Sequence, residues 1–93
     1  MIVGTARIEF HAPGARSLKD KRAIVRSLKD RLRNRCKVSV AEVDHQDLWQ
    51  RFALGVAVVG TDRRIVDAVL SSVLRICEAE RSAYLVDFAV EIL

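Results

Sequence analysis

Cysteine is scarce in this 93-residue chain, and the two that occur, Cys36 and Cys77, are not arranged for a shared task. Neither forms a CxxC pair or stands at a metal-binding spacing from a histidine. Cys77 lies on the apolar face of an expected helix, where a thiol acts as a small hydrophobic side chain. The sequence therefore predicts buried or incidental thiols, no metal site and no cofactor.

Long apolar runs are also missing, and the first residues show no basic leader followed by an apolar stretch. We therefore expect a cytoplasmic protein with no membrane partner. Low-complexity segments and internal repeats are absent as well, while 51% of residues are hydrophobic and 30% charged. This composition predicts a single folded domain over residues 1–93, with most apolar residues committed to one core and few left for a deep pocket.

Apolar periodicity predicts a strand over residues 2–10, followed by a helix that Ser17 caps, with Asp20 completing an approximate capping box. The helix is expected to end near Asn34. Its inner face should carry Leu18, Ile24, Val25, Leu28 and Leu32.

Two Val-rich strands are expected at residues 37–45 and 52–60, joined as a hairpin, and Asp62 should cap a second helix. A bulge near Ala41 or Glu42 would bring Val43 back into register. The second helix and last strand should bury Ile65, Val66, Val69, Val73, Ile76 and Cys77, then Tyr84, Val86, Phe88, Val90 and Ile92. The order βαββαβ predicts an α+β, ferredoxin-like fold, an antiparallel four-stranded sheet with two helices on one face.

Charge is distributed very unevenly. Residues 16–37 hold ten of the sixteen Lys and Arg but only two of the twelve acids, a net charge of +8 in a chain whose total is +4. At 100° per residue, five cations fall in one narrow stripe about 21 Å long, which matches several successive phosphates. With Lys21 in the first turn, they form the predicted nucleic-acid contact: Lys19, Lys21, Arg22, Arg26, Lys29 and Arg33.

Two observations favour a function for these cations over simple solvation. No acid is interleaved among the five, although mixed signs would give stabilising i,i+4 pairs. Lys19, Lys21 and Arg22 also lie in the first turn, where the helix dipole disfavours cations. Against this, Glu78 and Glu80 are placed equally unfavourably at the end of the second helix, so attraction between acidic and basic ends of two copies is an alternative.

The expected hairpin tip carries the chain's one Trp among acids, amides, a His and an Arg. Trp and Arg dominate interface hot spots, so this segment is the predicted partner contact. Its residues are Asp44, His45, Gln46, Asp47, Trp49, Gln50 and Arg51. Two alternatives stand beside this prediction: Trp49 folds back over the core edge, with the acids bonding within the turn, or Asp44, His45 and Asp47 bind a metal. A second His at ligand spacing is missing for the metal site.

Three strings together resemble the YlxP-like family of bacterial domains of unknown function: residues 17–22 (SLKDKR), 38–51 (VSVAEVDHQDLWQR) and 54–58 (LGVAV). The similarity spans essentially the whole chain. It implies a ferredoxin-like fold and, because the gene often neighbours those for translation initiation and ribosome maturation factors, a role near the ribosome. The family has no established catalytic residues, so the resemblance carries none to this chain.

We therefore expect a non-enzymatic domain that binds RNA or a ribosomal subunit, linked to ribosome maturation or translation. Base stacking on the sheet, as in an RRM, is not expected, because Phe10, Phe52, Tyr84 and Phe88 follow the core-facing phase. Two rivals remain. One is a self-associating, dimeric regulatory or small-ligand-binding domain. The other is an acylphosphatase-like enzyme with Arg16 as anion ligand, although the Gly and Arg pattern of that family's loop is absent.

Overall fold

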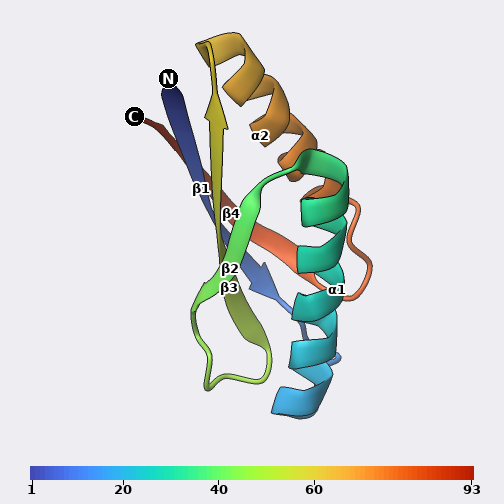
Figure 1. Cartoon of the computed structure of the whole chain (residues 1–93). Helices are drawn as coiled ribbons and strands as arrows, with labels where there is room; N and C mark the ends of the chain where they lie inside the picture. The colour runs from blue at the N-terminus through green and yellow to red at the C-terminus, as the bar shows by residue number, and fades with distance from the viewer.

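The computed structural model describes all 93 residues and confirms the predicted α+β, ferredoxin-like order. Four antiparallel strands form one sheet in the order β2-β3-β1-β4, and both helices cover the same face (Figure 1). The elements are β1 (Ile2–His11), α1 (Leu18–Cys36), β2 (Ser39–Asp44), β3 (Arg51–Gly60), α2 (Arg63–Glu78) and β4 (Tyr84–Ile92). The other face of the sheet, here called the open face, has no helix over it.

Successive side chains of β1 and β3 point alternately to the two faces of the sheet. Ala6, Ile8 and Phe10 point under the helices and pair with Val56, Leu54 and Phe52, and all six side chains are buried. The helices complete this core with Val25, Leu28, Leu32 and Cys36 from α1 and Val66, Leu70, Val73 and Cys77 from α2. Ile65, predicted to be buried, is instead exposed at the start of α2.

Both predicted helix caps are present. The Ser17 hydroxyl accepts a hydrogen bond from the Asp20 amide at 3.0 Å, and the Asp62 carboxylate accepts one from the Ile65 amide at 3.1 Å. The first helix runs two residues beyond the expected end at Asn34, to Cys36. It stops where Lys37 adopts a left-handed conformation, with φ of 52°.

The predicted bulge in β2 is present next to Glu42, with Val43 as the extra residue. The register with β3 shifts between Glu42 and Asp44, and Val43 stays on the open face. A Cβ at Gly55 would lie 2.7 Å from Cγ1 of Val43, so the glycine is what allows Val43 to lie across β3. The shift was expected to bury Val43, which was wrong because the extra residue is Val43 itself.

A second bulge changes the phase of β4. The pairing with β1 shifts between Glu9 and Phe10, so that Leu85 opposes Phe10 and Tyr84 opposes His11. Tyr84 is therefore 67% exposed, and Val86, the extra residue at the shift, is exposed too. Val90 keeps the expected phase opposite the buried Ala6, but it is exposed because β4 is an edge strand. The predicted burial of these three residues was wrong. Phe10 and Phe52 are buried as predicted, and Phe88 packs against the core edge.

Both thiols are free and buried, one at the end of each helix. Burial raises the pKa of Cys77 to about 12, so this thiol stays protonated and unreactive at neutral pH. Neither helix is long and apolar enough to cross a membrane.

Candidate nucleic-acid interface

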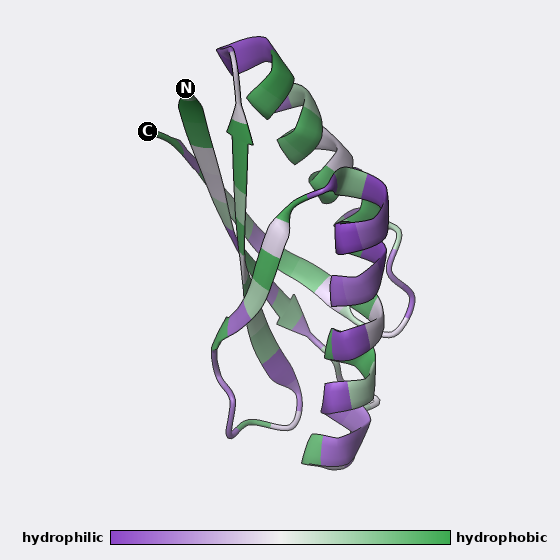
Figure 2. Cartoon of the chain, viewed as in Figure 1, coloured by the Kyte–Doolittle hydropathy of each residue, from purple (hydrophilic) through white to green (hydrophobic).

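Cationic side chains line the outer surface of α1. We define the basic stripe as Lys19, Arg22, Arg26, Lys29 and Arg33. Figure 2 shows the hydrophilic colour concentrated on this helix. Lys29 is partly covered and the other four are exposed. Four of the five take part in none of the nine ion pairs and make no side-chain hydrogen bond. These four are Lys19, Arg22, Arg26 and Lys29. Their charges therefore meet only solvent.

Arg33 is the exception in the stripe. Its guanidinium donates to the carbonyl of Val40 at 3.1 Å and lies 3.8 Å from the carboxylate of Asp30. Val40 belongs to β2, an edge strand, so this contact places the stripe along the β2 side of the molecule.

Lys21, predicted as a phosphate contact, is instead only 1% exposed. Its ammonium donates to the carbonyls of His45, Gln46 and Arg51 at 2.8, 3.1 and 3.4 Å. The carboxylate of Glu42 lies 3.2 Å away without hydrogen-bond geometry, so this ion pair acts through charge alone. Lys21 lies on the apolar face of α1 and faces the loop that joins β2 and β3. It therefore fixes that loop and is not available to a ligand.

Residues 45–50, here called the Trp49 loop, are held from a second side by the segment before α1. The Gln50 side chain donates to the carbonyls of Pro13 and Ala15 at 3.1 and 3.2 Å. The Ala12 amide donates to the Gln50 carbonyl at 2.8 Å. Gln50, predicted to meet a partner, is thus used to anchor the loop.

The exposed part of the loop is its tip. Trp49 is 54% exposed and Leu48 is 47% exposed, so Trp49 does not fold back over the core edge. With Asp47, Gln50 and Arg51 they line a shallow hollow. Leu48 was missed by the sequence analysis, although an apolar residue between Asp47 and Trp49 was a signal in its favour.

Three predicted partner residues are instead joined to β1 in a polar network. Glu9 lies 2.7 Å from Arg7, 3.1 Å from His45 and 3.5 Å from Arg51, and Arg7 also reaches Asp44 at 3.0 Å. The backbone N–H of His45 and the Arg7 guanidinium hold the pKa of Asp44 below its usual range. Asp44, His45 and Arg51 therefore fix the base of the loop, whereas the side chains of Gln46, Asp47, Leu48 and Trp49 make no hydrogen bond or ion pair within the protein.

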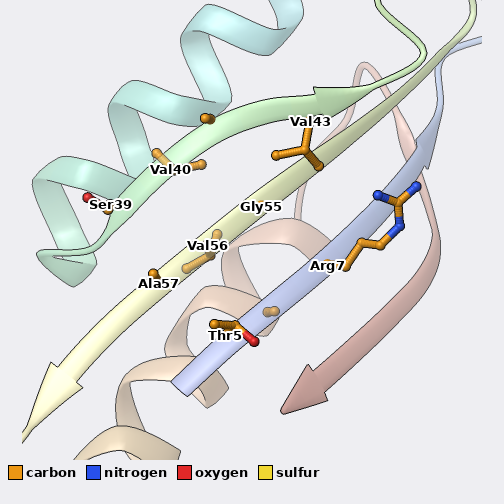
Figure 3. Close-up of a pocket in the computed structure, with 10 residues that line it drawn as sticks. Thr5, Arg7, Ser39, Val40, Val43, Gly55, Val56 and Ala57 are labelled. Atoms are coloured by element: carbon orange, nitrogen blue, oxygen red, sulfur yellow. The ribbon is translucent and has the colours of Figure 1, made fainter. Parts of the chain in front are cut away.

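The open face carries a separate shallow hollow over Gly55, between Val43 of β2 and Arg7 of β1 (Figure 3). Ala57 and Thr5 continue it along the sheet. Apart from Arg7, the side chains here are small or apolar. No cluster of three or more His, Cys, Asp or Glu side chains suited to a metal ion occurs here or elsewhere in the molecule.

Comparison with known proteins supports the sequence resemblance. The family described as protein of unknown function (DUF503) matches residues 3–90. The uncharacterized protein YlxP of Bacillus subtilis (strain 168) is 37% identical over 73 residues, which cover 78% of this chain and 79% of the relative. The predicted YlxP-like resemblance is thereby confirmed. Because the match spans nearly the whole chain, the protein belongs to the DUF503 family of proteins of unknown function.

Proposed function

We propose that this chain is a non-enzymatic, cytoplasmic RNA-binding domain whose basic stripe follows the phosphate backbone of RNA. The observation that carries this proposal is the set of four α1 cations with no partner in the protein: Lys19, Arg22, Arg26 and Lys29. From Lys19 to Arg33 the stripe is about 21 Å long at 1.5 Å per residue. A row of fixed positive charge of this length complements several phosphates in succession.

The energetics of the isolated helix support a ligand for the stripe. Like charges three and four residues apart destabilise a helix by about 0.2–0.5 kcal/mol per pair. Cations in the first turn add an unfavourable interaction with the helix dipole. Phosphate oxygens at the stripe would offset both terms, and they would meet Lys and Arg with charge-assisted hydrogen bonds.

Ribosomal RNA, free or within a ribosomal subunit, is the target that we propose. This part rests on the resemblance to the YlxP-like family and on the gene neighbourhood that it implies. The stripe itself recognises charge and shape, since phosphate contacts carry no sequence information directly.

Replacing Lys19, Arg22, Arg26 and Lys29 with Gln should remove most of the RNA affinity and leave the fold intact. The plot of log affinity against log salt should become shallower by about 3, because each lost phosphate contact reduces the slope by about 0.7–0.9. Affinity for structured ribosomal RNA across a salt titration measures this change.

The matched control removes four exposed cations outside α1: Arg63, Arg64, Arg75 and Arg81, each replaced with Gln. This variant has the same net charge as the stripe variant. It should keep nearly the wild-type salt slope. Equal losses in both variants would show that net charge and not the stripe governs binding, and would refute the proposed site.

A second candidate function, self-association through the open face, is favoured by the uncovered hollow over Gly55. Small side chains there allow another sheet to approach closely. If two copies pair in this way, Ala57→Glu should convert a dimer to a monomer with unchanged stability, since the carboxylate would be buried only in the dimer. Sedimentation equilibrium measures the change. A wild-type monomer at 100 µM, roughly the upper range for a functional dimer, would exclude this candidate.

A further inference from the structure

Trp49 is an exposed aromatic side chain on an unusually well-held loop. Surface loops are normally among the more mobile parts of a fold. Here the backbone carbonyls of His45, Gln46 and Arg51 accept from the buried Lys21 ammonium. Gln50 is fixed through both its amide side chain and its carbonyl. The backbone on either side of Trp49 is therefore held in place, which lowers the entropy lost when a ligand orders the loop.

The Trp49 loop adjoins the basic stripe. Lys21, on the apolar face of the N-terminal end of α1, touches the loop backbone with its ammonium, so the loop packs at the end of the helix where the stripe begins. At the other end of the stripe, Arg33 binds β2, the strand that leads into the loop. Figure 1 shows the loop and the N-terminal end of α1 at the same end of the molecule. A strand that follows the stripe toward Lys19 thus arrives at the end of the molecule that carries the Trp49 loop.

We propose that the hollow at Trp49 binds one unpaired base of an RNA strand whose backbone lies on the basic stripe. This inference rests on the proposed function and deepens it, because it specifies RNA with an unpaired nucleotide. The indole provides a face on which any base stacks, as aromatic side chains do in other proteins that bind single strands. A base within a duplex has no free face and is not a ligand for this hollow.

Asp47 gives the hollow a preference among bases. It lines the hollow with Trp49, and its carboxylate makes no ion pair in the protein. An ionised carboxylate only accepts hydrogen bonds, so it suits a base with donors on its pairing edge. Guanine presents two adjacent donors, N1–H and the N2 amino group, which one carboxylate accepts together. We therefore assign guanine as the preferred base.

Trp49 is the chain's one tryptophan, so its fluorescence reports on this hollow alone. The test compares three RNAs: a seven-nucleotide U3GU3 strand, a U7 strand and a fully paired duplex. The U3GU3 strand should quench Trp49 fluorescence and bind more tightly than U7, and the duplex should bind without quenching. Trp49→Ala should weaken U3GU3 binding about 5- to 150-fold, and Trp49→Phe should keep most of the affinity. Asp47→Asn should abolish the preference for U3GU3 over U7.

The outcomes separate this inference from the function on which it rests. Salt-sensitive binding of U3GU3 without quenching, and unchanged by Trp49→Ala, would overturn the base site while the stripe proposal stands; the loop would then be a surface for a protein partner. No salt-sensitive binding of any of the three RNAs would overturn the proposed function and this inference together. Quenching that is equal for U3GU3 and U7 would refute the assignment of guanine.

Discussion

Lys21→Met should reduce the free energy of unfolding by about 3–5 kcal/mol, the range found when one member of a buried ion pair is removed. The loop carbonyls of His45 and Gln46 and the carbonyl of Arg51 in β3 would lose their shared donor. The carboxylate of Glu42 would stay partly buried without its Lys21 partner. A domain of this size has a total stability of about 5–14 kcal/mol, so the variant would be marginal. Urea unfolding followed by circular dichroism at 222 nm measures the loss.

A second substitution separates the cost of the uncompensated Glu42 carboxylate from the cost of the lost hydrogen bonds to the three carbonyls. Lys21→Met combined with Glu42→Leu removes both ions, so no uncompensated carboxylate remains. The double variant should recover part of the stability lost in Lys21→Met, and what it does not recover belongs to the three carbonyls. A loss below 1 kcal/mol in the single variant would mean that Lys21 is solvated in solution, and the assignment of a loop anchor would fail.

The burial of Lys21 could have been predicted from the helical pattern of α1. On a helical wheel Lys21 falls among Val25, Leu28 and Leu32, the face predicted to be buried, and not within the basic stripe. Glu42 follows Val40 by two positions and so shares its inward face. Both facts were present in the sequence. A pairing of the two inward charges could have been predicted from them, whereas the three carbonyl contacts depend on how the loop folds.

Much of the fold could be predicted because local and long-range preferences agree. The alternation in β1 and the caps at Ser17 and Asp62 specify the same elements that the core requires. The bulge in β2 could be placed only to within a residue or two and the one in β4 not at all, since an extra residue changes the pairing but hardly changes the apolar pattern. As a result the burial expected for Val43 and Tyr84 was wrong.

The candidate site was predictable to a smaller extent. The basic stripe depends only on helical periodicity, so four of its members could be placed as exposed before the structure was known. The hairpin residues depend on contacts with distant segments, and these contacts decide their roles. Arg7 and Glu9 of β1 engage Asp44 and His45, and Pro13 engages Gln50. These partners are 35 or more residues away along the chain, so no local pattern identifies them.

Phe52→Ala should destabilise the protein by about 3–5 kcal/mol, because truncating a buried Phe removes transfer energy and leaves a cavity. Phe52 and Phe10 are fully buried directly opposite each other on neighbouring strands. Their rings stack with centroids 4.8 Å apart and planes at 12°. Phe52→Leu is the matched control. It keeps most of the volume and loses the ring pair, which contributes about 0.5–1.5 kcal/mol beyond its buried area.

The same pair predicts how two truncations combine. Phe10→Ala and Phe52→Ala open one shared cavity, so the double variant should lose less than the sum of the two single losses. Chemical unfolding of all four proteins with a common slope against urea gives this coupling energy. Strict additivity would mean that the rings do not stack in solution. A loss under 1 kcal/mol for Phe52→Ala would mean that the sheet and helices move together and fill the space of the ring. The core around Phe52 would then be less rigidly packed than the complete burial of this side chain indicates.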